Sequence, residues 1–523
     1  MNDQSPLNLD GRSLTIDDVV DVARRGRQVR LDPGAVEGMN ESRRYVDSLI
    51  QNGGEPVYGI NTGLGYFANR RLSTADAAAL SRNLVLSHAV GVGDPLPEEV
   101  VRAAMLIRAN TLAVGHSGVR PLIVETLLKM LNAGVYPLIP EQGSLGSSGD
   151  LAPLSHLALM FTRGDDESAS GQAGSVADGR DAMAAAGIER IVLGAKEGLA
   201  LSNGTSFSAA LSALAVADAI NIIHHAVLAT AMVFEALLGV TSALDERLHR
   251  VRRRQGQQAV AARLRALLAG STLVDSDPRV QDAYSLRCVP QILGPVEETI
   301  AFVRGWVEDE INAVTDNPLI FNDGDGRMRA ISGGNFHGEV LSLGADFLGV
   351  ALAEVGALAE RQINRLLLGD GAAGLPTMLV ARPEDAGLNS GLMMPHYTAV
   401  SLVLENQTLA HPDAVHSLPT SAGQEDVNAN SQNAAMHLRK IVENVENILA
   451  ILFFTAAQAI DLRVERATGA RPSSAVEQLH RRIREKSAKV EKDRFYQSEI
   501  RQIHSLVKSQ ALRQDASGIS APS

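Results

Sequence analysis

Three long segments with helical periodicity limit what this chain can fold into. Apolar residues recur every three or four positions over residues 341–368 and 438–462, which places them on one face of a helix. Residues 205–239 are apolar on more than one face, as expected for a helix at the centre of a bundle. Aromatic residues make up only 4% of the chain, which favours packed helices over a β-sandwich. We therefore predict a mainly α fold with a long central helix bundle.

The periodicity also suggests how the chain is divided. Residues 1–200 mix short helical patterns with a strand-like run at residues 56–60, so we expect a mixed N-terminal region. Residues 201–510 carry the long periodic segments and are expected to form the bundle domain. Residues 511–523 are polar and contain Ser, Pro and Gly, which predicts a disordered tail. Residues 165–181 lack an apolar period and are predicted to form an exposed loop.

Charge and cysteine content exclude several classes of protein. The net charge of −12 argues against nucleic acid or an anionic membrane as the main partner. Polar residues such as Asp218 and Glu235 interrupt the apolar tract at residues 207–238, so we expect a buried helix rather than a membrane span. The single cysteine, Cys288, and the lack of a visible signal peptide favour the cytoplasm. No spacing typical of zinc ligands is present, and we expect no metal.

One loop contains residues that could react with one another. Residues 143–150 read GSLGSSGD. They would suit a flexible turn in which Asp150 caps the next helix, or a phosphate-binding loop, although the lysine of the P-loop is missing. A third interpretation is chemical: the amide nitrogen of Gly149 attacks the carbonyl carbon of Ser147, because a residue without a Cβ allows a close approach. Loss of that oxygen and of the Ser148 hydroxyl as two waters leaves an electrophilic methylidene-imidazolone.

This loop and several distant segments, from about residue 15 to about residue 465, resemble the histidine, phenylalanine and tyrosine ammonia-lyase family. The resemblance implies a fumarase/aspartase-like helix bundle. It also implies a 4-methylidene-imidazol-5-one (MIO) prosthetic group made from Ser147, Ser148 and Gly149, without a metal or a diffusible cofactor. A homotetramer is implied too, with active sites that each draw on three subunits. Most members have alanine where this chain has Ser147; only the carbonyl of that residue enters the ring, so we expect the change to be tolerated.

Two further segments match the family and would supply catalytic groups. Residues 58–65, YGINTGLG, resemble its mobile inner loop, which implies that Tyr58 is the base that removes the β-proton. A packing role at a strand end is the alternative for this tyrosine. Residues 203–205, Asn-Gly-Thr, also match, which implies that Asn203 hydrogen-bonds the cyclised loop or the substrate amine. The same asparagine would suit a turn that caps the following helix.

A third match covers residues 281–291, QDAYSLRCVPQ. It implies that Arg287 holds the substrate carboxylate with its two parallel donors and that Gln281 also contributes to substrate binding. Tyr284 would support the prosthetic ring. Without the resemblance, an arginine beside a tyrosine is usually a surface pair. A fourth match, GGNFHG at residues 333–338, implies that Phe336 packs near the ring.

Three positions bear on which aromatic ring is accepted. His88 can hydrogen-bond an imidazole or a phenol, although a histidine that simply packs in its helix is the alternative. Glu425 stands in a Gln-Glu-Asp sequence typical of histidine-type members, and a carboxylate can pair with an imidazole but gains little from a phenyl ring. Met393 also fits the histidine type. Residues 427–430, Val-Asn-Ala-Asn, depart from the usual His-Val-Ser-Met.

These observations predict an enzyme that eliminates ammonia from a small aromatic amino acid, with L-histidine converted to urocanate as the favoured reaction. A tyrosine or phenylalanine ammonia-lyase is the first alternative, and a 2,3-aminomutase on the same scaffold is the next. From other classes, a catalytically inactive helical scaffold and an argininosuccinate-type relative with similar bundles remain open. The complementary set of a base, a carboxylate clamp and a ring-selecting pair argues against an inactive protein.

Overall fold

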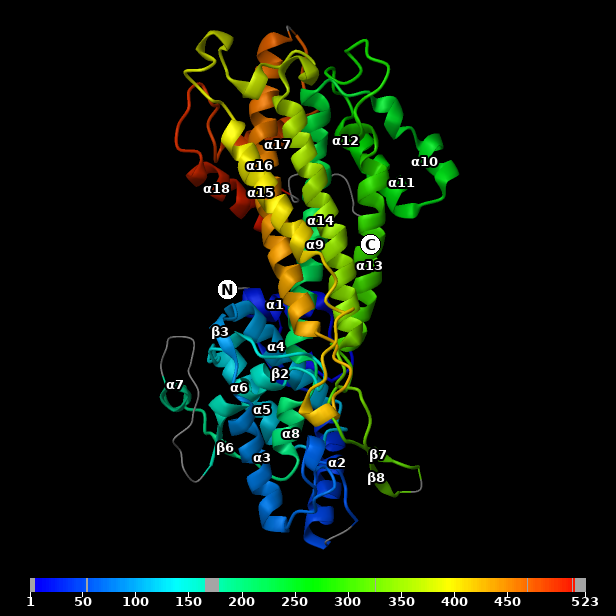
Figure 1. Ribbon diagram of the computed structural model, residues 1–523, viewed down its shortest axis with the longest axis vertical. Helices are drawn as coiled ribbons and strands as arrows, with labels where there is room; N and C mark the ends of the chain where they lie inside the picture. Colours follow the sequence, from blue (N-terminus) through cyan, green and yellow to red (C-terminus); the bar gives the residue numbers. More distant parts are fainter. Residues whose placement is uncertain are drawn as a thin grey trace. The chain divides into compact units, whose positions relative to one another are not determined.

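The computed structural model describes residues 5–52, 55–164, 178–324, 326–467, 469–509 and 511–512. Within these ranges the chain is mainly helical, and its strands form two-stranded sheets (Figure 1). This confirms the predicted fold class. Most of the loop predicted at residues 165–181 and of the tail predicted at residues 511–523 lies outside the described residues.

The chain forms two compact units, each assembled from separate stretches of sequence. Unit 1 comprises Met1–Ala217, Arg304–Asp346 and Pro412–Met436, and unit 2 comprises Asp218–Val303, Phe347–His411 and His437–Ser523. The predicted boundary at residue 200 was drawn from the sequence pattern alone, whereas these units follow contacts in space. Four of the five boundaries between the units fall inside helices α9 (Ser206–Ala236), α13 (Val289–Glu310), α14 (Glu339–Leu367) and α16 (Ser431–Arg466), and the fifth lies between His411 and Pro412, outside any helix.

Unit 1 combines short helices with small sheets. Helix α4 is buried along nearly its whole length and packs against α1 and α5, because it is apolar on every side except at a few charged positions. The strands pair as β1–β2 and β5–β6, both parallel, and as β3–β4 and β7–β8, both antiparallel. The elements of this unit are α1 (Ile16–Arg25), α2 (Pro33–Asn52), α3 (Thr74–His88), α4 (Glu98–Ala113), α5 (Pro121–Ala133), α6 (Leu151–Phe161), α7 (Gly179–Ala185), α8 (Glu197–Ser202), the 3-10 turns η1 (Gly65–Phe67) and η6 (Ser421–Gly423), and the strands β1 (Leu7–Leu9), β2 (Val29–Leu31), β3 (Val92–Pro95), β4 (Pro140–Gln142), β5 (Thr162–Arg163), β6 (Ile191–Val192), β7 (Leu319–Asn322) and β8 (Met328–Ile331).

Unit 2 is built from helices. Its elements are α10 (Glu246–Arg252), α11 (Gln255–Leu267), α12 (Tyr284–Arg287), α15 (Met393–Leu409), α17 (Ser474–Arg484), α18 (Gln497–Lys508) and the 3-10 turns η2 (Thr241–Leu244), η3 (Gly369–Ala372), η4 (Thr377–Leu379) and η5 (Pro383–Asp385). Close backbone packing marks α11 and α13, where a Cβ added to Gly256 would lie 2.3 Å from the carbonyl oxygen of Gly294. The residues at this crossing must therefore be small.

The long helices follow the predicted periodicity. The segments at residues 205–239, 341–368 and 438–462 correspond to α9, α14 and α16. By length and composition alone, these three helices could each cross a membrane, but 83% of the apolar window of α9 and 89% of that of α16 is buried inside the protein, against 50% for α14. Helices α9 and α16 therefore place their apolar faces in the protein's own core.

The strand predicted at residues 56–60 was wrong, because these residues form a turn. The side chain of Asn61 accepts the backbone N–H of Val57 at 2.7 Å, and the φ of Gly59 is +66°. A side chain that satisfies the local backbone competes with a sheet ladder, and a left-handed glycine interrupts the extended conformation. The following inner loop begins from this turn.

Candidate active site

Unit 1 contains a cavity of about 1000 Å³ that gathers residues from distant parts of the sequence. Its lining includes seven of the residues singled out in the sequence: Tyr58, His88, Ser147, Ser148, Asn203, Phe336 and Glu425. The loop at residues 143–150, hereafter the Gly-Ser loop, supplies the two serines. The fold therefore brings the predicted base, the predicted ring-selecting pair and the predicted cyclising residues to a single hollow.

Asp150 fixes one end of the Gly-Ser loop in an unexpected way. It stands at the N-cap position of α6, but its side chain makes no capping bond there. Its carboxylate instead accepts the backbone N–H groups of Phe207 and Ser208, each at 2.8 Å, in the first turn of α9. Ser144 and Ser208 donate their hydroxyls to the same carboxylate. Burial raises the pKa of Asp150, although these four donors act in the opposite direction. The loop is thus tied to α9 as well as to α6.

Gly149 sits where no other residue fits. Its φ is +75°, and a Cβ added to it would lie 2.3 Å from the carbonyl oxygen of Gly204. The next residue, Asp150, donates its backbone N–H to that same carbonyl at 2.7 Å. A glycine is required here because both the left-handed conformation and the close backbone approach exclude a side chain.

Asn203 holds the neighbouring residue of the loop. Its side-chain nitrogen donates to the carbonyl oxygen of Ser148 at 2.6 Å. Its side-chain oxygen is buried and has no hydrogen-bond partner among the described residues. A buried acceptor without a partner is costly and suggests a ligand or a reacting group as its missing donor.

Arg108 lies behind Asn203 and was not singled out in the sequence. Its guanidinium donates to the backbone carbonyls of Asn203 at 2.6 Å and Ala200 at 3.2 Å, at the C-terminal end of α8. Burial lowers the pKa of Arg108 to about 10, while Asp316 and Asp150 act in the opposite direction, so the group stays charged at neutral pH. The positive charge meets the negative end of the α8 dipole.

A buried ion pair completes this layer. Lys196 and Asp316 are both fully buried and lie 2.5 Å apart, and Ser117 donates to the second oxygen of the carboxylate at 2.7 Å. Burial lowers the pKa of Lys196 and its aspartate partner opposes that shift. The sequence contained a signal for Arg108, because it is a charged residue inside an apolar helical run and such a residue needs a partner when it is buried. Lys196 precedes α8 and is not part of a helical run, so it lacked that signal.

Tyr58 lies in the turn that precedes the inner loop. Its hydroxyl accepts the backbone N–H of Gly65 at 3.2 Å, which fixes the phenol against the start of η1. Tyr66 and Phe67 in the same turn are largely exposed and also line the cavity. The inner loop therefore forms part of the cavity wall and orients the phenol within it.

His88 and Glu425, the two residues predicted to select the ring of a substrate, both line the cavity. His88 is the last residue of α3, and its Nδ1 lies 2.9 Å from the Ser87 hydroxyl. Burial lowers the pKa of His88, whereas the Leu84 carbonyl and the Glu425 charge raise it, so the imidazole is mostly neutral at pH 7. Glu425 accepts the hydroxyl of Ser148 at 2.9 Å and that of Thr420 at 3.2 Å.

Four of the predicted residues lie in unit 2 and do not line this cavity. The guanidinium of Arg287 donates to Gln281 at 2.9 Å and lies 4.6 Å from the centroid of the Tyr284 ring. Tyr284 is 68% exposed. Met393 begins α15. The structure brings Gln281, Tyr284 and Arg287 together with one another, and their roles toward a substrate stay predictions.

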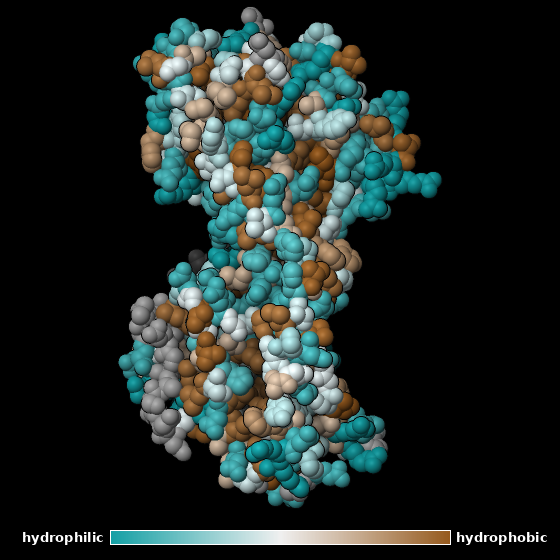
Figure 2. Space-filling model, viewed as in Figure 1, coloured by the Kyte–Doolittle hydropathy of each residue, from teal (hydrophilic) through white to brown (hydrophobic). Residues whose placement is uncertain are grey.

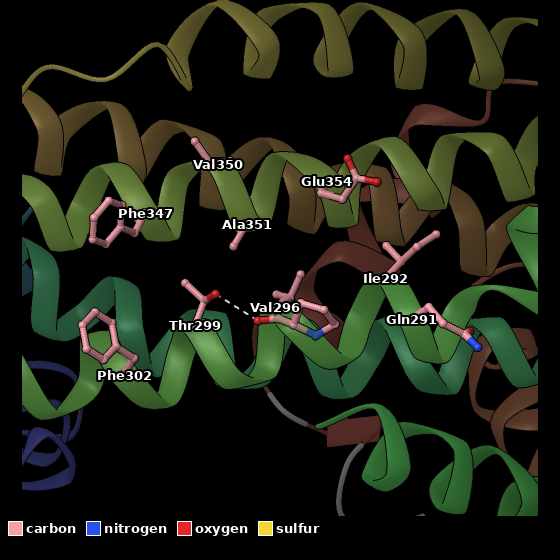
Figure 3. A pocket seen from close by; sticks show the side chains of 10 residues that line it. Gln291, Ile292, Val296, Thr299, Phe302, Phe347, Val350, Ala351 and Glu354 are labelled. Carbon is pink, nitrogen blue, oxygen red and sulfur yellow. Dashed lines mark hydrogen bonds between the residues drawn. The ribbon is translucent and has the colours of Figure 1, made fainter. Parts of the chain in front are cut away.

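A second hollow in unit 2 is apolar. A groove of about 630 Å³ runs between α13 and α14. Figure 3 shows Phe302, Phe347 and Val350 projecting from these helices around it, and each of these side chains is about half exposed. The space-filling view also shows apolar residues exposed among polar ones on the face in view (Figure 2). Such a groove is typical of a surface that binds another protein chain.

Known proteins match both the sequence and the fold. The family model described as aromatic amino acid lyase matches residues 14–485. The chain is 49% identical over 460 residues to the histidine ammonia-lyase of Gloeobacter violaceus, with 87% of this chain and 88% of that protein covered.

Solved structures agree. The crystal structure of histidine ammonia-lyase from Trypanosoma cruzi has a TM-score of 0.88 at 38% identity and covers 99% of this chain and 96% of its own. Tyrosine aminomutase from Streptomyces globisporus has a TM-score of 0.90 at 34% identity, with coverage of 99% and 100%. Together with the cavity that joins the Gly-Ser loop to Tyr58, Asn203 and Glu425, these matches show that the chain is a carbon–nitrogen lyase and belongs to the aromatic amino acid lyase family.

Proposed function

We propose that this lyase eliminates ammonia from L-histidine and releases urocanate. The observation that carries the proposal is the position of Glu425, which lines the cavity and lies within hydrogen-bond distance of Ser148. A carboxylate there can accept the N–H of an imidazole, and a site built to accept that hydrogen bond rejects a phenyl ring, which leaves the acceptor unpaired. The histidine ammonia-lyases among the similar proteins support the same substrate.

The electrophile is a methylidene-imidazolone formed from Ser147, Ser148 and Gly149. A bond forms between the Gly149 nitrogen and the Ser147 carbonyl carbon, whose oxygen leaves as water; the Ser148 hydroxyl and its α-hydrogen leave as the second water. The residues fit such a group, because Gly149 has no room for a Cβ and Asn203 holds the Ser148 carbonyl. When formed, the group supplies an electrophile that turns the substrate amine into a better leaving group.

The other residues bind the substrate and move its protons. The Tyr58 phenol takes the β-proton, and the inner loop orients it through Gly65. The side-chain oxygen of Asn203, which has no partner among the residues that the structure describes, accepts a hydrogen bond from the substrate amine. Phe336 lines the cavity and is the expected apolar contact of the ring. This arrangement combines positioning with general base catalysis.

A complete site is proposed to need further copies of the chain in a homotetramer. Arg287 is the expected partner of the substrate carboxylate, but it is absent from the lining of the cavity in unit 1. Tyr284 is exposed and Arg287, which stacks on it, is partly exposed, so this pair is available to another copy. The apolar groove between α13 and α14 offers a surface on which such copies can pack. A cytoplasmic location stays a prediction from the sequence.

The second candidate is an aminomutase, which would return ammonia to the β-carbon. The similarity to tyrosine aminomutase, at a TM-score of 0.90, favours this alternative.

One experiment tests both candidates. Histidine, tyrosine and phenylalanine are each incubated with the enzyme, and ultraviolet spectra record urocanate, coumarate and cinnamate. Chromatography of the amino acids detects β-amino acid products.

We expect urocanate to form from histidine and the intact mass of the protein to be lower by two waters. An intact mass without that loss would contradict the prosthetic group. A protein that has lost both waters but leaves histidine unchanged and consumes tyrosine would contradict the substrate.

A further inference from the structure

Two serine hydroxyls of the Gly-Ser loop reach the same neighbouring segment. Ser148 donates to the carboxylate of Glu425 at 2.9 Å, and Ser147 donates to the side-chain oxygen of Asn428 at 2.6 Å. The loop and this segment, residues 425–430, are about 280 residues apart in the sequence. Each of the two consecutive serines therefore has its own partner on the segment that carries the ring-selecting carboxylate.

Asn428 is the point at which this segment is anchored. Its backbone N–H donates to the Ser417 hydroxyl at 2.8 Å, and its side-chain nitrogen donates to the carbonyl of Leu418. Asn428 and Ser147 are 2% and 5% exposed, respectively. Because both groups are buried, neither can exchange its partner for bulk water at no cost.

Ser147 and Asn428 thus form a buried pair of one hydrogen-bond donor and one acceptor. Replacing either one alone would leave a buried polar group without its partner, which costs more than replacing both.

We propose that the bond between Ser147 and Asn428 is a positioning device that holds Glu425 at the cavity. The inference rests on the proposed function, because formation of the prosthetic group removes the Ser148 hydroxyl and with it the bond that Ser148 donates to Glu425. Glu425 then becomes free to accept a substrate imidazole. The Ser147–Asn428 bond remains after that reaction and keeps the segment against the loop, because the hydroxyl of Ser147 takes no part in ring closure.

The proposal predicts an effect on substrate binding rather than on cyclisation. The ring forms from backbone atoms of Ser147, Ser148 and Gly149, and the methylidene from the side chain of Ser148; none of these changes when the Ser147 hydroxyl or Asn428 is replaced. A displaced segment moves Glu425, so KM for histidine rises while kcat and the loss of two waters change little. A merely structural bond would lower stability without this split between KM and kcat.

The test is a double-mutant cycle in the full-length protein. Ser147→Ala, Asn428→Val and the double variant are compared with wild type by intact mass, by KM and kcat for histidine, and by thermal unfolding. We expect each single variant to raise KM by about tenfold, the scale of one unpaired buried group. The double variant should have a KM within about threefold of that of Asn428→Val alone, because the shared bond can be lost only once. Effects of Ser147→Ala and Asn428→Val that simply multiply would overturn the proposal.

Two further variants make the test specific. Ser147→Thr keeps the hydroxyl and should rescue most of the rise in KM that Ser147→Ala causes; a tenfold rise over the wild-type KM would contradict the proposal even if Ser147→Ala does not fold. Ser144→Ala is the control, because it removes a buried hydroxyl of the same loop that donates to Asp150 and not to Asn428. When it is combined with Asn428→Val, the fold-changes in KM of the two single variants should multiply. A wild-type protein that does not lose two waters, or does not consume histidine, counts against the proposed function rather than against the pair.

Discussion

The side chain of Asn203 donates a hydrogen bond to the carbonyl oxygen of Ser148 at 2.6 Å. The backbone carbonyl of the same asparagine is held by the buried guanidinium of Arg108 at 2.6 Å. Asn203 thus links a charged group in the interior of unit 1 to the central residue of the Gly-Ser loop. The loop is therefore held from behind as well as at its end, where Asp150 binds the first turn of α9.

Ser148→Ala should abolish activity, because the second water of ring formation comes from the Ser148 hydroxyl. We expect the intact mass to lack the loss of that water and kcat to fall by at least about 10³-fold, the scale on which a covalent group contributes. Intact-mass spectrometry and urocanate absorbance measure the two effects. Full activity in this variant would exclude the proposed prosthetic group.

Glu425→Gln should weaken the preference for histidine. The amide keeps the shape of the side chain but removes the charge that favours an imidazole N–H. Loss of a hydrogen bond to a charged group weakens binding by about 1–3 kcal/mol. We expect kcat/KM for histidine to fall by about 10- to 100-fold, while turnover of phenylalanine, if measurable, does not fall in parallel. An equal loss for both amino acids would show that Glu425 does not select the ring.

Arg108→Lys should lower activity through Asn203. A lysine cannot donate to the carbonyls of Asn203 and Ala200 with the same geometry, so we expect a loss of about 2 kcal/mol in the free energy of unfolding and a lower kcat. Arg102→Lys is the matched control, because Arg102 is also buried in α4 but binds the backbone carbonyls of Val22 and Ala23.

The two arginine variants are compared by urea unfolding and by kcat for histidine. The control variant should lose similar stability and keep its kcat. If both variants lose kcat to the same extent, the contribution of Arg108 is general stability rather than the position of Asn203.

Arg287→Ala and Glu425→Ala should complement each other if the two residues serve the same site from different copies of the chain. Each variant alone is expected to be inactive, since one lacks the carboxylate partner and the other the ring-selecting group. When the two are coexpressed, mixed oligomers contain some sites with both residues intact, and part of the activity should return. No recovery in mixed oligomers, once these are verified by mass, would place both residues of a site on a single copy.

Glu235→Gln should change how stability depends on pH. Glu235 is buried on α9 and accepts the backbone N–H of Ser473 at 2.9 Å, and burial raises its pKa to about 7. The folded state therefore holds a proton that the unfolded state releases above pH 4.5, so the stability contribution of Glu235 is full below pH 4.5 and is lost as the pH rises to about 7.

The variant has no such proton to lose. We expect it to be more stable than wild type at pH 8 by about 3 kcal/mol, and to match wild type at pH 4. Urea unfolding at a fixed protein concentration across this pH range measures the difference. A constant difference at all pH values would show that Glu235 does not titrate in this window.

Several features could be predicted from the sequence because they depend on local pattern. The periodicity of residues 341–368 and 438–462 determines α14 and α16, since a helix that must bury one face repeats its apolar residues at that spacing. The Ser-Ser-Gly triplet, Tyr58 and Asn203 could be selected as site residues because their side chains have the required chemistry.

The tertiary structure decided what these residues touch. The short run at residues 56–60 is a turn because Asn61 and Gly59 satisfy the backbone locally, a competition that the strand-like composition does not reveal. Asp150 suits the cap of the helix that follows it, yet it caps α9, because its position in space, and not in the chain, brings the free N–H groups to it. The bond between Ser147 and Asn428 likewise joins two residues that lie 281 positions apart in the sequence. The sequence determines the chemistry of each side chain. Which hydrogen-bond donor meets which acceptor is decided only by the packing that brings distant segments together.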